Sequence, residues 1–376
     1  MPALSDARLS GIRDTCVREP SLDPDYRNWL TERVSRIEAD FNRSADTHLL
    51  PFNLPGLEGI DLYLKDESTH PTGSLKHRLA RSLFLYGLCN GRIRPGATVV
   101  EASSGSTAVS EAYFARLLEI PFIAVVPHGT SAAKMSEIER FGGICHACEP
   151  KMIYAEAERI ARETGGCYLD QFTYAERATD WRGNNNIAES LFEQMELERF
   201  PAPEWVIVGA GTGGTSATIG RFIRYRPEMY AHTKLCVADP DNSVFFESYR
   251  DGCRKTERET RSRIEGVGRP RVEPSFIDEI VDLVIKVSDD ASIGTTHWLE
   301  QRLKRRCGPS TGLNVYAMIS LALQMKARDE TGSLVTLICD GGERYSDTIY
   351  NPDWLETENI NMAPTLSELD ALFPAN

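Results

Sequence analysis

Residues 205–226, "WVIVGAGTGGTSATIGRFIRYR", decide the fold class of this chain. An apolar run typical of a buried strand leads into a glycine-rich turn, and the turn leads into a helical pattern. Residues 97–118, "ATVVEASSGSTAVSEAYFARLL", repeat the same order. Further buried strands are predicted within residues 121–129, 234–242, 279–290 and 333–345. Because these strands alternate with helices, the sequence predicts an α/β fold with mainly parallel sheets.

Length and charge narrow the class of protein. A chain of 376 residues exceeds what a single small core holds, so two domains are expected. The net charge of −13 argues against nucleic acid or an anionic membrane as a partner. No apolar run is long enough for a membrane helix, and the polar residues 1–14 contain no apolar core of a signal peptide. The nine cysteines are scattered, which is typical of reduced thiols, and a cytoplasmic location is expected.

Cys145 and Cys148 form a CxxC motif within "GGICHACEP". A single CxxC without a second cysteine pair or clustered histidines is a weak signal for zinc or redox chemistry. We therefore predict no metal site, and the sequence leaves the role of this pair open.

Small-residue loops follow predicted strands or precede predicted helices at three places. Ligands of parallel α/β sheets lie beyond the carboxyl ends of the strands. In residues 209–215, "GAGTGGT", glycines and a helix start favour a phosphate group. The same loop also matches the dinucleotide pattern G-x-G-x-x-G, with Asp239 about 30 residues later as a possible ribose ligand. The third interpretation is a tight turn with no ligand.

The other two loops are residues 103–107, "SSGST", and residues 308–312, "GPSTG". Hydroxyl and N–H groups of the first suit a carboxylate or phenolate oxygen, although serines also cap helices. In the second, Ser310 either caps the following helix or donates a hydrogen bond to a ligand ring. Neither loop alone distinguishes the two interpretations.

Lys76 lies in residues 71–80, "PTGSLKHRLA", near the start of a helix predicted from about Ser74 to Gly87, with Ser74 near the N-cap. The positive end of the helix dipole disfavours the charged ammonium group and lowers its pKa. A readily deprotonated lysine can act as a nucleophile or a base. The alternative is an ordinary solvated lysine.

Lys76 and the three loops together resemble the fold-type II pyridoxal-phosphate enzymes, and in particular the cysteine synthase and cystathionine β-synthase family. The resemblance covers roughly residues 50–350 and includes "GGERY" at 341–345. It implies pyridoxal 5'-phosphate bound to Lys76 as a Schiff base, with the freed amine as the base that removes the Cα proton. The implied cofactor-binding residues are Lys76, Ser106, Gly211, Thr212, Gly213, Gly214, Thr215 and Ser310. The implied substrate-carboxylate residues are Ser103, Ser104, Gly105, Thr107 and Gln171, the last within "DQFTY".

One loop departs from the family pattern. The family's asparagine, which bonds the phenolic oxygen of the cofactor, is Ser106 here, and the next two residues are Thr107 and Ala108. The sequence around this loop, "EASSGSTAVSEAYFA" at residues 101–115, is most similar to the L-cysteine desulfhydrase branch. This similarity implies α,β-elimination of L-cysteine, or of a close β-substituted alanine, to sulfide, pyruvate and ammonia. A neutral serine at the ring nitrogen favours elimination over transamination.

Three alternatives remain at this point: β-replacement of the cysteine synthase or cystathionine β-synthase type, an NAD-dependent dehydrogenase, and a non-catalytic relative. The resemblance also implies two domains with the cofactor in the cleft between them. A large cofactor-binding domain is expected from residues 1–79 and 190–376, and a small mobile domain from residues 80–189. A homodimer is implied as well.

Overall fold

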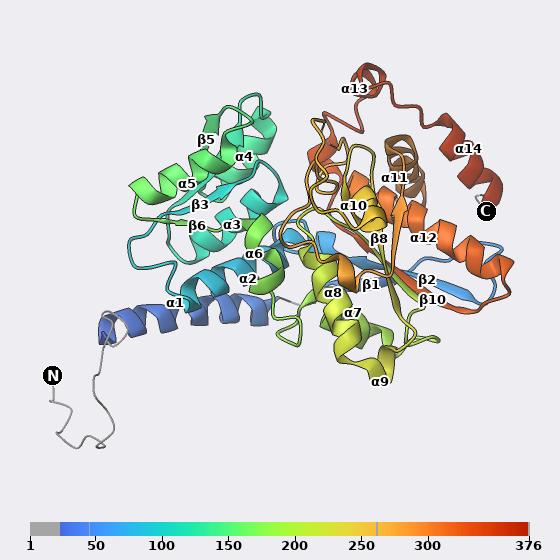
Figure 1. Cartoon of the computed structure of the whole chain (residues 1–376), viewed down its shortest axis with the longest axis horizontal. Coiled ribbons are helices and arrows are strands. Elements are labelled where there is room, and N and C mark those ends of the chain that lie inside the picture. Colours follow the sequence, from blue (N-terminus) through green and yellow to red (C-terminus); the bar gives the residue numbers. More distant parts are fainter. Residues whose placement is uncertain (1–22, 45, 261, 375–376) are drawn as a thin grey trace.

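The computed structural model describes residues 23–44, 46–260 and 262–374 (Figure 1). Residues 1–22, to which the signal-peptide prediction refers, lie outside the described residues. Within the described ranges, no helix is both long and apolar enough to cross a membrane.

The larger of the two sheets has six strands in the order β1-β2-β10-β7-β8-β9. Its strands are β1 (His48–Pro51), β2 (Ile60–Asp66), β7 (Trp205–Gly209), β8 (Lys234–Asp239), β9 (Leu283–Lys286) and β10 (Gly332–Ile338). All neighbouring pairs are parallel except β1 and β2. The smaller sheet is parallel throughout, in the order β5-β4-β3-β6. Its strands are β3 (Val99–Ala102), β4 (Phe122–Pro127), β5 (Ile144–Cys148) and β6 (Cys167–Tyr168). The predicted α/β class with mainly parallel sheets is confirmed.

Helices cover both sheets, and Figure 1 shows two lobes side by side. Beside the smaller sheet lie α1 (Pro24–Arg43), α2 (Lys76–Cys89), α3 (Ser106–Leu117), α4 (Ala132–Arg140), α5 (Ile153–Glu163) and α6 (Gln171–Ala178). The other lobe holds α7 (Ile187–Met195), α8 (Gly214–Tyr225), α9 (Pro227–Tyr230), α10 (Phe245–Asp251), α11 (Asp289–Leu303), α12 (Pro309–Ala327), α13 (Pro352–Thr357) and α14 (Ala363–Leu372). Short 3₁₀ turns are η1 (Glu67–Thr69), η2 (Asp278–Ile280) and η3 (Glu343–Tyr345).

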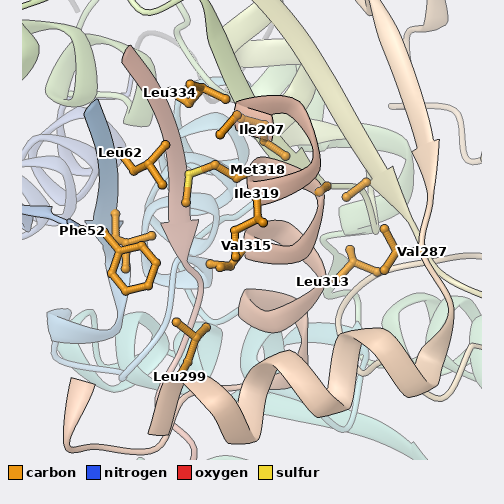
Figure 2. Close-up of a cluster of buried hydrophobic side chains, with 14 of the residues drawn as sticks. Phe52, Leu62, Ile207, Val287, Leu299, Leu313, Val315, Met318, Ile319 and Leu334 are labelled. Atoms are coloured by element: carbon orange, nitrogen blue, oxygen red, sulfur yellow. The ribbon is translucent and has the colours of Figure 1, made fainter. Parts of the chain in front are cut away.

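The core of the larger lobe is built around α12. This helix is apolar on almost all sides, as expected of a helix inside a domain. Figure 2 shows Val315 and Met318 of α12 packed toward Leu62 of β2 and Leu334 of β10. This packing fixes the first turn of α12, and with it Ser310, beside the carboxyl end of β10.

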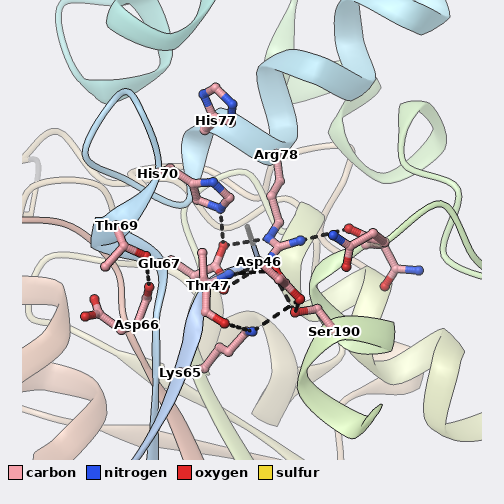
Figure 3. Close-up of polar contacts among 12 residues, drawn as sticks. Asp46, Thr47, Lys65, Asp66, Glu67, Thr69, His70, His77, Arg78 and Ser190 are labelled. Atoms are coloured by element: carbon pink, nitrogen blue, oxygen red, sulfur yellow. Dashed lines mark hydrogen bonds and ion pairs between the residues drawn. The ribbon is translucent and has the colours of Figure 1, made fainter. Parts of the chain in front are cut away.

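A buried ionic network ties α2 to the larger sheet (Figure 3). Arg78, two residues after Lys76, donates to Glu67 at 2.7 Å and to Asp46 at 2.8 Å. Burial alone would raise the pKa of Glu67, but the charges and hydrogen bonds of Arg78 and His70 together outweigh it and hold that pKa well below its usual value. Removing one partner of such a pair costs several kcal/mol, about 3–5. The network therefore orients α2 and the lysine at its start.

The start of α2 differs from the prediction. The helix begins at Lys76 rather than at Ser74, and its N-cap is Leu75, which makes no side-chain capping bond. Instead the backbone N–H of Leu75 donates to the carbonyl of Cys339, just beyond β10, at 2.9 Å. A tertiary hydrogen bond, rather than a local side-chain cap, therefore anchors the start of α2.

Candidate active site

The loops that follow β3, β7 and β10 open into one cavity of about 420 Å³. Every predicted site residue except Gly214 lines it, namely Lys76, Ser103, Ser104, Gly105, Ser106, Thr107, Gln171, Gly211, Thr212, Gly213, Thr215 and Ser310. Gly214 lines a small adjoining cavity together with Lys76, Thr212 and Thr215. Residues far apart in sequence therefore surround one space that is large enough for a small ligand.

Glycines are required in the loop between β7 and α8 by close backbone approaches. Gly213 is the N-cap of α8 and has a φ of +89°. A Cβ atom there would come within 2.5 Å of the Cα of Phe276, and one at Gly211 within 2.3 Å of the carbonyl oxygen of Gly266. The N–H of Gly214 donates to the Oγ1 of Thr212 at 3.1 Å. The N–H groups of a first helical turn point out of the helix, so the start of α8 is suited to an anion. This arrangement fits the phosphate of pyridoxal phosphate.

Lys76 lies half-buried in the cavity wall. Burial is the main cause that lowers its pKa, and the nearby charge of Arg269 lowers it further. Cys339 and Asp340 act in the opposite direction. The lowered pKa agrees with the direction expected from the sequence, but desolvation is the leading cause in the structure.

The serine loop and Gln171 are brought together across 64 residues of sequence. The Oγ1 of Thr107 donates to the side-chain oxygen of Gln171 at 2.7 Å. Gly105 is the N-cap of α3, and its N–H donates to the Oγ of Ser103 at 3.3 Å. The hydroxyls and the free N–H groups at this helix start can hold a carboxylate.

Ser310 lies in the first turn of α12, whose N-cap is Gly308, so it does not cap the helix. It faces the cavity next to Cys339. Burial raises the pKa of the Cys339 thiol to about 12, and the hydroxyl of Ser310 opposes that shift. A neutral hydroxyl is thus available at this wall of the cavity.

The sequence analysis missed Asp340 and Arg344 as site residues. Arg344 belongs to the noted "GGERY" segment at 341–345, and Asp340 directly precedes it. Burial raises the pKa of Asp340 to about 6, and the hydroxyl of Tyr345 donates to it at 2.6 Å. Arg344 donates a hydrogen bond to the Oγ of Ser106, the residue that departs from the family pattern. A guanidinium from the larger lobe therefore reaches the start of α3 in the smaller lobe.

Two further contacts cross the cavity. Lys134 of α4 forms an ion pair with Glu265 at 2.7 Å. Arg269 donates to the hydroxyl of Tyr154 on α5, also at 2.7 Å. Residues 249–271 suggest a solvated surface by their charge, but residues 262–270 line the cavity instead. Two of their charged side chains, Glu265 and Arg269, contact the opposite lobe, whereas Arg263 pairs with Asp289 of the same lobe. Sequence composition does not reveal these partners.

Asp239 does not serve the alternative dinucleotide site. It is fully buried, and its carboxylate accepts from the N–H of Phe246 at the start of α10, at 2.9 Å. Burial raises its pKa to about 6. It is therefore part of a helix start and not of the cavity wall.

Cys145 and Cys148 lie on β5, the edge strand of the smaller sheet, and both are free thiols. Burial is the first cause that raises the pKa of each. Over the described ranges, no group of three or more metal-ligating side chains occurs.

Comparison with known proteins gives the class. The family model for pyridoxal-phosphate dependent enzymes matches residues 45–340, so the chain belongs to that family. The predicted family and its cofactor, pyridoxal 5'-phosphate, are confirmed.

Two relatives in sequence and one solved structure resemble the chain to different extents. The chain is 56% identical over 353 residues to the L-cysteine desulfhydrase Cds1 of Mycobacterium tuberculosis strain H37Ra, covering 93% of this chain and 94% of the relative. It is 25% identical to cysteine synthase 1 of Neurospora crassa, covering 80% of each. The crystal structure of O-ureido-L-serine synthase aligns with a TM-score of 0.70 at 22% identity, covering 82% of this chain and 96% of the other. The last comparison shows the fold alone, and the predicted fold-type II architecture is confirmed.

Proposed function

We propose that this chain is a pyridoxal-phosphate-dependent carbon–sulfur lyase that converts L-cysteine to sulfide, pyruvate and ammonia. The observation that carries the proposal is the 56% identity to an L-cysteine desulfhydrase over almost the full length of both chains. The resemblance of residues 97–118 to that branch, including Ser106, supports the same conclusion.

The cavity offers a group for each part of the cofactor. Lys76 would carry it covalently, the loop 211–215 would hold its phosphate, Ser310 would face its ring nitrogen and Ser106 its ring oxygen. Once bound, pyridoxal phosphate supplies an electron sink for cleavage of the Cα–H bond and loss of the β-substituent.

The chain's own groups bind the substrate and move the proton. Thr107, Gln171 and the N–H groups of residues 103–105 would hold the substrate carboxylate and so orient the Cα proton. Lys76 would accept that proton at its Nζ atom, a role that burial favours because it lowers the pKa of the ammonium group. The neutral hydroxyl of Ser310 leaves the ring nitrogen without a carboxylate partner, which favours elimination.

The two lobes suggest how the site excludes water. We assign residues 80–189 to a small mobile domain and residues 1–79 with 190–376 to a large one, except that α1 packs on the small domain through Ile37. The ion pair between Lys134 and Glu265 would close the cavity when the lobes approach. A homodimer, which the family resemblance implies, and a cytoplasmic location, which the scattered cysteines favour, are part of the same proposal.

Incubation of the holoenzyme with L-cysteine alone tests the reaction. Sulfide and pyruvate should appear in equal amounts. A second incubation with O-acetylserine and sulfide measures β-replacement, which the likeness to a cysteine synthase keeps as the second candidate. Cysteine formation far above the rate of pyruvate release would overturn the lyase assignment in favour of replacement.

A further inference from the structure

Two fully buried carboxyl groups lie directly beneath the serine loop. Glu101 is near the end of β3, and Glu111 is on α3, so the loop 103–105 connects the elements that carry them. Both residues have no exposed surface. A buried carboxyl must be protonated or well paired, because an isolated charge in the interior is costly.

Glu101 is bonded to both segments that form the carboxylate-binding wall. One of its oxygens accepts from the backbone N–H of Ala102 at 2.8 Å, immediately before the serine loop. The other accepts from the backbone N–H of Gln171 at 3.1 Å. Because Thr107 in turn donates to the side chain of Gln171, Glu101 lies at the base of a chain of bonds that reaches the cavity.

Glu111 has a different environment. Its two oxygens have no hydrogen-bond partner of ordinary geometry among the residues that the structure describes. Burial raises its pKa well above the usual value, and the adjacent carboxyl of Glu101 raises it further. Burial is also the first cause that raises the pKa of Glu101. Two carboxyls in such a site share a proton, because they cannot both ionise at low cost.

The other groups that face the pair strengthen this conclusion. Asp170, the N-cap of α6, and Cys167 of β6 act on the two carboxyls, and each disfavours a further negative charge. Tyr168 of β6 also faces Glu101, and its own pKa is raised. None of these three groups is a cation, and the nearby Arg92 donates to the backbone carbonyl of Tyr168 at 2.6 Å, so a proton is what neutralises the pair.

We propose that Glu101 is a positioning residue for the substrate carboxylate and that Glu111 supports it by donating the shared proton. Glu101 as the ionised partner accepts two backbone hydrogen bonds, from Ala102 and Gln171, and the proton of Glu111 would be donated to it as well. The inference rests on the proposed function in one respect, that Gln171 and the loop 103–107 bind the substrate carboxylate. Loss of the shared proton at high pH would leave two repelling carboxylates and displace Gln171.

The test compares Glu111→Gln, Glu111→Leu and the parent holoenzyme from about pH 6.5 to 9.5. The amide of Glu111→Gln keeps a donor to Glu101 but cannot ionise. Its KM for L-cysteine should lie within about twofold of the parent at pH 7, and the alkaline rise in KM should be smaller. Glu111→Leu removes the donor, and its KM should rise at least about fivefold at pH 7. Both variants should keep the parent kcat and affinity for pyridoxal phosphate.

Glu101→Gln provides the direct perturbation. The side-chain NH₂ of the new amide would face one of the two backbone N–H donors, those of Ala102 and Gln171, and so one hydrogen bond would be lost. KM should therefore rise about tenfold, while cofactor affinity stays unchanged. Two results for Glu101→Gln would overturn the inference: an unchanged KM, or a loss of cofactor affinity as large as the rise in KM. An alkaline rise in KM as large in Glu111→Gln as in the parent would overturn it as well. Titration with L-alanine, followed by the absorbance of the bound cofactor, measures carboxylate binding without any elimination. It therefore tests this inference even if L-cysteine proves not to be the substrate.

Discussion

Substitution of Gly213 by alanine probes whether the phosphate loop depends on close backbone contact. The residue has a φ of +89°, a left-handed conformation that costs an L-residue about 1–2 kcal/mol. The added Cβ would lie 2.5 Å from the Cα of Phe276 and 2.6 Å from the carbonyl oxygen of Ser275. Overpacking of this kind adds about 1–3 kcal/mol, because backbone atoms must move. The expected loss of unfolding free energy is therefore about 2–5 kcal/mol.

Gly129→Ala is the matched control. Gly129 has a φ of +86° and no heavy atom within 4 Å of the added Cβ, so it carries the conformational cost alone. Urea unfolding of both apo-variants gives the steric part as the difference between them. Titration with pyridoxal phosphate should show at least tenfold weaker binding for Gly213→Ala, about 1.4 kcal/mol, and parent affinity for Gly129→Ala. Equal destabilisation of the two variants with unchanged cofactor affinity would refute the reasoning.

Three further predictions use other residues. Lys76→Ala should lose sulfide release and the visible absorbance of the bound cofactor while remaining folded by circular dichroism; full turnover would move the nucleophile elsewhere. Burial first, and then the charge of His70, lowers the pKa of His77 to about 2, whereas the pKa of an unfolded histidine is about 6.5. The neutral His77 therefore contributes its full share to the free energy of unfolding above about pH 6.5, and this share is lost as the pH falls. From pH 7.5 to pH 5 the parent should therefore lose about 2 kcal/mol more unfolding free energy than His77→Phe, and parallel urea-unfolding curves would contradict this. Ser106→Asn replaces the hydroxyl that accepts from Arg344 and should lower the ratio of pyruvate to cysteine formed from O-acetylserine at fixed sulfide, by up to about tenfold; an unchanged ratio would show that residue 106 does not set the outcome.

Most of the site could be predicted from local sequence because its binding groups are backbone N–H groups and small side chains at strand ends. The order of strand, glycine turn and helix in residues 205–226 places the start of α8 at the edge of the larger sheet. The same order places the serine loop at the start of α3. Parallel sheets bring such ends to one side, so the three loops and Lys76 line one cavity as the pattern suggested.

The sequence did not predict the contacts between segments that are far apart in the chain. The start of α2 is held by a backbone hydrogen bond from Leu75 to Cys339, where the sequence had predicted a cap by Ser74. Residues 262–270, within the charge-dense stretch after residue 249, line the cavity. Each outcome depends on which lobe faces the segment, and local periodicity carries no information on that.

The sequence by itself thus determined the α/β class, which follows from backbone periodicity and from glycines at turns that act over a few residues. The cofactor, and Lys76 as the residue proposed to carry it, followed from the resemblance of Lys76 and the three loops to a known family. Only the tertiary structure decided that Glu101 bonds to Gln171, 70 residues away, and that Arg344 reaches Ser106, 238 residues away. Such contacts form only when the chain closes on itself, and burial then sets the pKa of each carboxyl. That is why the groups positioning the substrate loop are visible in the fold and not in the motif.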